Sequence, residues 1–99
     1  MSLGEITQQM QERIGDDAGI GKIIKFDFGD DGILRIDDSQ TPAVVNNDDG
    51  DSDVTIKVTL DDYKAIASGD QNAQMAFMMG KLKVEGDMGL AMRLGQILG

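Results

Sequence analysis

The sequence contains no histidine and no cysteine, and it has only one proline and no tryptophan. Without histidine, the chain has neither the commonest general base nor the means to build a Ser-His-Asp triad. Histidine and cysteine are also the usual ligands of zinc, and a chain without cysteine forms no disulfide and has no thiolate nucleophile. We therefore expect a protein that is not an enzyme and that needs no metal or cofactor.

Positive charge is also scarce in this chain. Nine Lys and Arg side chains oppose eighteen Asp and Glu, which gives a formal net charge of -9 at pH 7. Because binding to nucleic acid depends on Lys and Arg near the phosphates, we expect no nucleic-acid partner. No apolar run approaches the ~20 residues that span a bilayer, and the N-terminus does not resemble a secretory signal. These features predict a soluble, cytoplasmic protein.

What the chain does contain is the composition of one folded domain. Hydrophobic residues make up 40% of its 99 residues and charged residues 27%, which is typical of a globular protein. A chain of this length buries roughly two-thirds of the surface that it exposes when unfolded, which is enough for one modest core. We therefore expect residues 1–99 to form a single domain.

Hydrophobic periodicity predicts a helix followed by strands in the N-terminal half. Ile6, Met10 and Ile14 recur at every fourth position, which predicts an amphipathic helix over residues 4–15. Apolar and polar residues then alternate on both sides of an Asp-Asp-Gly turn, which predicts a β-hairpin over residues 23–37. A short third strand is expected just after the single proline, at residues 43–46.

The third quarter of the chain alternates between strand and helix patterns. Strict alternation over residues 53–60 predicts a strand that runs into Asp61, a good N-cap for a short helix closed by Gly69. Asn72 then caps a second helical segment, residues 73–79, which is apolar on every side. Because such a segment has no face suited to water, we expect it to be buried.

The last twenty residues contain the most apolar helix of the chain. A strand over residues 81–86 leads to Asp87, a good N-cap for a helix over residues 88–98. Arg93 and Gln96 are the strongly polar side chains of this helix. Its apolar side chains spread over roughly 220° of the helical wheel, about twice the stripe of a surface helix. Such a helix needs apolar cover on more than one side.

Strand and helix patterns together predict the fold class. Each predicted strand has one apolar and one polar face, whereas the last two helices are apolar nearly all round. We therefore expect an α+β fold in which the helices cover one face of an antiparallel-rich sheet. The acidic run NNDDGDSD at residues 46–53 does not match the ligand spacing of a calcium-binding EF-hand loop, and we interpret it as a turn.

Methionine is unevenly distributed along the chain. Five of the seven methionines lie between residues 75 and 92. Methionine is flexible and polarizable, and it suits surfaces that adapt to apolar ligands of varied shape. It also fills gaps in ordinary small cores. The residues alone leave both interpretations open, a pliable wall for a hydrophobic ligand or simple core filling.

Two strings in the second half of the chain are informative, DVTIKV at residues 53–58 and LDDYKAIASGDQNAQMAFMMGKLKVEGDMGLAMRLGQIL at residues 60–98. Through them, the chain from residue 53 onward resembles the sterol carrier protein type-2 domain family. Within the second string, GKLKVEGDMGLAMRL at residues 80–94 is the most specific part. KFDFGDDG at residues 25–32 also fits the first hairpin of that family. The chain thus resembles a stand-alone, acidic member of the family.

This resemblance implies both a fold and a function. The implied fold is a five-stranded, antiparallel-rich mixed sheet with helices covering one face and an apolar tunnel between the two layers. The implied function is the non-catalytic binding and transfer of lipids, such as fatty acyl chains, phospholipids or sterol-like molecules. The partners expected on this basis are a lipid or fatty acyl ligand and, transiently, a membrane, with the protein a monomer or a weak homodimer.

The resemblance also predicts which residues bind the lipid, because it places residues 88–98 along the tunnel. Together with the inward faces of the strands and the methionine-rich segment, this predicts the following lipid-binding residues: Phe26, Ile56, Val58, Met75, Met78, Leu82, Val84, Met88, Leu90, Met92 and Leu94. Peroxisomal members of the family end in a Ser-Lys-Leu-like tripeptide. The last three residues here are Ile97-Leu98-Gly99, so we do not expect peroxisomal import.

A second hypothesis places the protein in a different functional class. The apolar helix over residues 88–98 would then bury its spare face against a second protomer or another protein, and no tunnel would exist. Both hypotheses use the same apolar surface, so the sequence leaves the choice between a lipid carrier and a protein-interaction or dimerisation module open.

Overall fold

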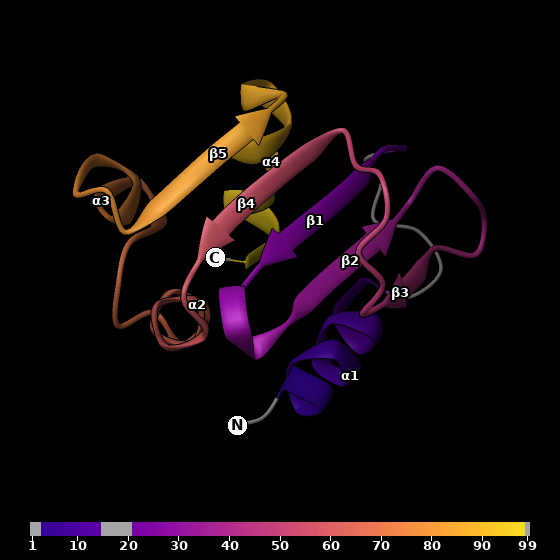
Figure 1. Ribbon diagram of the computed structural model, residues 1–99, viewed down its shortest axis with the longest axis horizontal. Helices are drawn as coiled ribbons and strands as arrows, with labels where there is room; N and C mark the ends of the chain where they lie inside the picture. The colour runs from indigo at the N-terminus through magenta and orange to yellow at the C-terminus, as the bar shows by residue number, and fades with distance from the viewer. Residues whose placement is uncertain (1–2, 15–20, 99) are drawn as a thin grey trace.

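The protein is built on one five-stranded sheet. The computed structural model describes residues 3–14 and 21–98 of the chain. The strands follow the order β3-β2-β1-β4-β5 across the sheet, as Figure 1 shows. Their bounds are β1 Ile23–Asp27, β2 Ile33–Asp37, β3 Val44–Asn46, β4 Val54–Val58 and β5 Leu82–Gly86. A single 3₁₀ turn, η1 (Gly29–Asp31), joins β1 to β2 and confirms the predicted hairpin.

The sheet is mixed, as the sequence predicts. β1 and β4 run parallel, with Ile24 opposite Val54, while the other three neighbouring pairs run antiparallel. The two strands of a parallel pair need a crossover connection between them, and here β2, β3 and the acidic loop before β4 supply it. β1 and β4, which are distant in sequence, therefore pair in the middle of the sheet.

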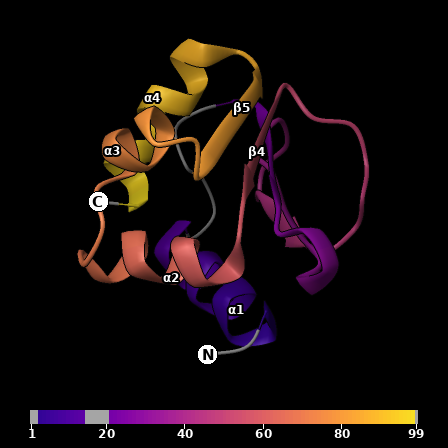
Figure 2. The same cartoon turned by 60° about the vertical axis from the view of Figure 1, so that its left-hand side comes forward.

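In residues 3–14 and 21–98, four α-helices lie on one side of the sheet, which confirms the predicted α+β architecture (Figure 2). Their bounds are α1 Leu3–Ile14, α2 Leu60–Ser68, α3 Ala73–Met78 and α4 Met88–Leu98. α1 contacts β3, α3 contacts β5, and α4 contacts β4 and β5. Opposite edges of the sheet are thus covered by helices from opposite ends of the chain.

The predicted amphipathic helix α1 closes the β3 side of the core. Ile6, Met10 and Ile14 are all buried, as their four-residue spacing predicts. Gln11 Nε2 donates a hydrogen bond of 3.0 Å to the carbonyl of Val45 in β3. The place where the sequence predicts the helix to end, residues 15–17, lies outside the described residues.

The core is made by the alternate residues of the strands that face the helices. β1 and β2 contribute Ile24, Phe26, Leu34 and Ile36, whose exposed fractions are 0–1%. The ring of Tyr63, from α2, lies edge-on to Phe26 at a centroid distance of 5.5 Å. Because alternating residues point to opposite faces, the same strands present their charged residues on the other side of the sheet.

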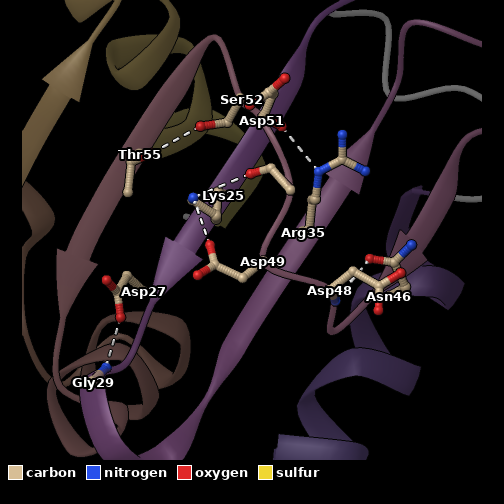
Figure 3. A network of polar contacts seen from close by, with 11 residues as sticks. Lys25, Asp27, Gly29, Arg35, Asn46, Asp48, Asp49, Asp51, Ser52 and Thr55 are labelled. Carbon is tan, nitrogen blue, oxygen red and sulfur yellow. Dashed lines mark hydrogen bonds and ion pairs between the residues drawn. The ribbon is translucent and has the colours of Figure 1, made fainter.

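The β1–β2 part of that outer face is covered by the acidic loop between β3 and β4 (Figure 3). Lys25 Nζ lies 2.8 Å from Asp49 Oδ1 and also donates to the carbonyl of Gly50 at 3.2 Å. Arg35 Nε donates to the carbonyl of Asp51 at 3.0 Å. The interpretation of this run as a turn agrees with these contacts, because its charges and carbonyls serve to hold the loop on the sheet. Within the described residues, no group of His, Cys, Asp or Glu is arranged to hold a metal ion.

The start of α2 differs from the sequence prediction by two residues. We expected Asp61 as the N-cap, but the N-cap is Thr59, whose side-chain oxygen accepts a hydrogen bond of 3.1 Å from the N–H of Asp62. Thr59 has an extended backbone with ψ 154, while Asp61 already lies in the first helical turn. Thr59, Asp61 and Asp62 are all residue types that can cap a helix. The position at which β4 ends determines which of them becomes the N-cap. Gly69 closes the helix with φ 86, as predicted.

The expectation that α3 is buried is wrong. Among the described side chains from Gln74 to Met79, only Ala76 is buried, and the large apolar side chains around it are exposed. The reason is its position: this six-residue helix follows α2 at the β5 edge of the sheet and presents one narrow side, that of Ala76, to the protein. A helix that is apolar on all sides is buried only if other elements pack on every side of it. At the edge of the sheet, neighbouring elements lie on one side only.

Candidate functional site

The β4–β5 half of the sheet holds the strand residues predicted to bind lipid. Phe26, Ile56 and Val84 are neighbours across β1, β4 and β5, and Val58 lies opposite Leu82. Phe26, Ile56 and Val58 are buried, whereas Leu82 and Val84 are only partly buried. The structure therefore brings the five strand residues together on the helix-facing side, with burial decreasing toward the β5 edge.

Helix α4 lies against this half of the sheet and carries four of the predicted residues. Leu90 is buried, and its N–H donates a hydrogen bond of 3.2 Å to Oδ1 of Asp87, the residue that precedes the helix. Met88 and Met92 lie close to half a turn from Leu90, and Met92 is 76% exposed. The side chain of Leu94 lies outside the described part of the structure.

Helix α3 carries the remaining two predicted residues, and both are exposed. Met78 is 74% exposed because it points away from Ala76, the one described side chain by which α3 is anchored. Met75 is also exposed, at a position to one side of Ala76. Of the described predicted residues, six therefore belong to the packed layer and four methionines lie on the surface. Their role in holding a lipid stays a prediction.

The two ends of the helical layer differ sharply in how well they are packed. At the β3 end, Ile6, Met10 and Ile14 of α1 are all buried. At the β5 end, six large apolar side chains of α3 and α4 are exposed: Met75, Phe77, Met78, Met79, Met88 and Met92. Exposed apolar side chains that lie close together often mark a binding surface, whereas single scattered ones are common and carry no such meaning.

A second feature, a groove between α1 and α2, has no signal in the sequence. It has a volume of about 570 Å³, within the range of small-molecule sites. Ile6 and Met10 lie among its lining residues, as do the cationic side chains of Arg13 and Lys64. None of the predicted lipid-binding residues lines it. Two helices that are distant in sequence form this groove, so periodicity within either helix could not reveal it.

Tyr63 joins this groove to the aromatic core. Its ring lies edge-on to both Phe26 and Phe28, with centroid distances of 5.5 and 5.2 Å. Burial raises the pKa of Tyr63 to about 12, because a phenolate would lose its hydration there, and the charge of Arg13 offsets a smaller part of that effect. The phenol is therefore neutral at physiological pH and acts as a packing residue rather than as an acid or base.

Comparison with known sequences identifies related proteins. The family model described as the SCP-2 sterol transfer family matches residues 7–99. Sterol carrier protein 2 of Homo sapiens is 46% identical over 52 residues, which are 52% of this chain and 10% of the human protein. The chain thus matches about a tenth of that relative's length. Non-specific lipid-transfer protein-like 1 of Caenorhabditis elegans is 33% identical over 94% of this chain and 86% of its own length.

Comparison with solved structures finds the same fold. The solution structure of palmitated SCP2L2 from Aedes aegypti covers 99% of this chain and 95% of its own, with a TM-score of 0.72 and 24% identity. At that level of identity, the likeness speaks for the arrangement of the sheet and helices and not for particular side chains. Within residues 3–14 and 21–98, moreover, the helices are too short or too polar to cross a membrane.

Proposed function

The chain belongs to the SCP-2 sterol transfer family, and from this we propose that it binds and transfers lipids without catalysing a reaction. The observation that supports the proposal is the uneven packing of the helical layer. Four of the predicted lipid-binding residues on α3 and α4, Met75, Met78, Met88 and Met92, are exposed, and the neighbouring strand residues Leu82 and Val84 are only partly covered. A lipid chain lying against these side chains would remove their apolar surface from water.

We place the acyl chain between the β4–β5 half of the sheet and helices α3 and α4. This is the proposed tunnel, and α4 would be its lid. Leu90 anchors α4 to the sheet, while Met88 and Met92 would turn toward the ligand when the helix shifts over it. Unbranched methionine side chains adapt readily to such a change of partner.

The ligand class that we propose is a molecule with a long acyl chain. The Aedes aegypti relative was solved in a palmitated form, which supports a fatty acyl ligand among the three predicted classes. Phospholipids and sterol-like molecules remain members of the panel to be tested. The cytoplasmic location and the assignment of residues 1–99 to a single domain stay predictions.

The first experiment is solvent extraction of the purified protein followed by mass spectrometry, beside native mass spectrometry of the intact sample. We expect an acyl lipid in near-stoichiometric amount, with a matching mass shift of the native protein. A clean unliganded mass, together with no uptake from a panel of fatty acids and phospholipids, would contradict the carrier function.

A set of variants tests where the lipid lies. Met92→Asp places a charge at the proposed lid without disturbing the core, because Met92 is exposed, and we expect it to abolish lipid uptake. Val44→Asp is the matched control, since Val44 is an exposed apolar residue of β3 at the far edge of the sheet. Lys64→Glu reverses a charge in the α1–α2 groove. Loss of uptake in Lys64→Glu but not in Met92→Asp would move the ligand to the groove.

The protein-interaction module remains the alternative function, and one observation favours it. Met88 and Met92 are exposed on the side of α4 that faces away from Leu90, where a second protomer could cover them. The alternative predicts a dimer whose stability depends on protein concentration and is lost in Met92→Asp. The carrier hypothesis predicts instead that this variant changes lipid uptake and leaves the sedimentation of the lipid-free protein unchanged.

A further inference from the structure

The charges of this acidic protein are unevenly distributed along the chain. Residues 1–70 contain sixteen Asp and Glu and six Lys and Arg, whereas residues 71–99 contain two acidic and three basic side chains. The fourteen residues from 71 to 84 contain no acidic side chain at all. That acid-free stretch comprises α3 and the start of β5, which are the elements with exposed apolar side chains.

Apolar and cationic side chains follow one another directly at the end of α3. Phe77, Met78 and Met79 are exposed, and Lys81 and Lys83 follow on β5, where both are exposed as well. Gly80 separates the two groups with φ 77, a turn that ends the helix. Lys83 lies opposite Lys57 on the outer face of the sheet, whereas α3 lies on the helix side, so the two groups flank the edge strand β5 from its two sides. We call these five residues, Phe77, Met78, Met79, Lys81 and Lys83, which together surround this edge, the α3–β5 surface.

The two lysines of this surface are available to a partner. Within the described residues, neither forms an ion pair, although Lys57 on the adjacent strand pairs with Glu85 at 3.1 Å. Lys83 lies opposite Lys57 across the β4–β5 ladder, so Glu85 already serves the neighbouring cation. The carboxylate of Glu85 is therefore already paired with Lys57. Lys81 and Lys83 have no ion-pair partner among the described residues, so they can bind anionic groups of another molecule.

We propose that the α3–β5 surface is the membrane-docking surface of this protein, with Phe77, Met78 and Met79 entering the interface of a phospholipid bilayer while Lys81 and Lys83 contact its anionic headgroups. The inference deepens the proposed function and rests on it, since a lipid carrier must load and unload at a bilayer. Apolar side chains beside lysines match the layering of a membrane interface, with acyl chains beneath charged headgroups.

The distribution of charge favours a bilayer over a second copy of the chain. A two-fold interface across this surface would bring Lys81 and Lys83 of both protomers together, and like charges oppose such an association. An anionic bilayer has the complementary sign. The remaining acidic part of the molecule would then be repelled from the same bilayer, which orients the protein with α3 toward the lipid.

Helix α1 is the obvious rival for membrane contact, because it is the amphipathic helix of the chain. Its apolar side chains Ile6, Met10 and Ile14 are all buried against the sheet. They could reach a bilayer only if α1 left the core. The short helix α3 needs no such rearrangement, because its apolar side chains are already exposed.

Cosedimentation with two kinds of vesicle tests the proposal. One kind is phosphatidylcholine alone, and the other is phosphatidylcholine and phosphatidylglycerol in equal amounts. We expect the wild-type protein to partition more strongly onto the mixed vesicles. Phe77→Asp combined with Met79→Asp should lower partitioning onto both kinds by at least about tenfold, because charges are expelled from the interface. Val44→Asp should leave partitioning unchanged, since Val44 lies at the opposite edge of the sheet.

The two lysines are tested separately from the apolar side chains. Lys81→Gln combined with Lys83→Gln should weaken binding to the mixed vesicles by about tenfold or more and leave binding to phosphatidylcholine nearly unchanged. Lys22→Gln is the control, because it removes an exposed cation from the acidic part of the chain. Equal loss in the control, or wild-type protein that binds neither vesicle, would overturn the proposal. So would a lipid-free dimer that Met79→Asp dissociates, because the surface would then belong to a second copy.

Uptake of a fatty acid from solution, without vesicles, separates this proposal from the carrier function. Phe77 and Met79 are outside the predicted lipid-binding set, so their aspartate variants should still take up fatty acid while failing to bind vesicles. Vesicle binding without any lipid uptake would remove the carrier function and leave the docking surface standing. Lipid uptake without vesicle binding would remove the docking surface and leave the carrier function standing.

Discussion

Tyr63 illustrates how a single side chain acquires properties that its own chemistry does not supply. The ring lies edge-on to those of Phe26 and Phe28, and burial raises its pKa to about 12 from an ordinary value of 10.0. No pattern in the sequence distinguishes this tyrosine from an exposed one. Its position in the first half of α2 shows that it is helical, but Phe26, in the strand that it meets, lies 37 residues earlier in the chain.

The raised pKa predicts how stability changes in alkali. Because the phenol ionises near pH 10 in the unfolded chain and near 12 in the folded one, the unfolded state loses its proton first as the pH rises. The stabilising contribution is therefore complete below pH 10 and is lost between pH 10 and 12. We expect the free energy of unfolding to fall by about 2 kcal/mol across this interval.

Denaturant unfolding at several pH values measures this change. Tyr63→Phe is the control, because it keeps the ring and removes the ionisable group, and its stability should fall less over the same interval. Tyr63 is the only tyrosine of the chain and there is no tryptophan, so phenolate absorbance reports this residue alone. A folded-state titration centred at 10 would show that the side chain is not buried as described.

At the level of the secondary-structure elements, the end of β5 depends on a close approach of backbones at Gly86. A Cβ atom built on Gly86 would lie 2.5 Å from the carbonyl oxygen of Asp53 and 3.1 Å from the Cα of Val54, and φ is +106. Asp53 is also the residue by which β1 and the start of α4 are joined to β4. Its N–H donates to the carbonyl of Ile23, and its own carbonyl accepts from the N–H of Asp87.

We therefore predict that Gly86→Ala lowers the free energy of unfolding by about 2 kcal/mol or more. The clash is with backbone atoms, which cannot move aside as the end of a flexible side chain can. Gly69→Ala is the matched control: Gly69 also has a positive φ, +86, but no atom lies within 4 Å of its built Cβ. That variant should cost about 1 kcal/mol, from backbone strain alone. Equal losses in both variants, measured by denaturant unfolding, would show that the close approach at Gly86 has no energetic consequence.

Several elements follow from local sequence, and the exceptions have identifiable reasons. The hairpin of β1 and β2, the buried stripe of α1 and the glycine cap of α2 are all confirmed, because each depends on residues within a few positions of one another. The prediction that α3 is buried was wrong, because burial depends on which other elements the fold places around a helix. The N-cap of α2 was misplaced by two residues for a related reason, since the end of β4 determines where the helix begins.

For the molecule as a whole, the proposed tunnel must be reconciled with modest stability. A lipid-sized cavity of at least roughly 300 Å³ would cost about 7 kcal/mol if it stayed empty, at about 24 cal/mol per Å³. A domain of this size has a total stability of roughly 5–15 kcal/mol. The exposed methionines of α3 and α4 are consistent with a lipid-free state in which part of the apolar surface of these helices lies outside.

Ligand binding and stability should therefore be coupled. At a lipid concentration of about 100 times the dissociation constant, binding adds about 2.7 kcal/mol to the free energy of unfolding. For a domain of this length, that corresponds to a rise in melting temperature of roughly 10 °C or more. Calorimetry of extracted protein with and without a saturating fatty acid measures the shift, with Met92→Asp as the variant that should show none. Equal melting temperatures for the wild-type protein would contradict the carrier function.

The sequence by itself determined what depends on residue type and local period. The alternation of the strands and the apolar helices led to the fold class, and the string at residues 80–94 led to the family. Tertiary structure alone decided which apolar side chains are covered. Hydrophobicity states only that a side chain avoids water, and whether it can do so depends on neighbours brought from elsewhere in the chain. For that reason, Leu90 and Met92 belong to one apolar helix, yet the fold buries the first and exposes the second.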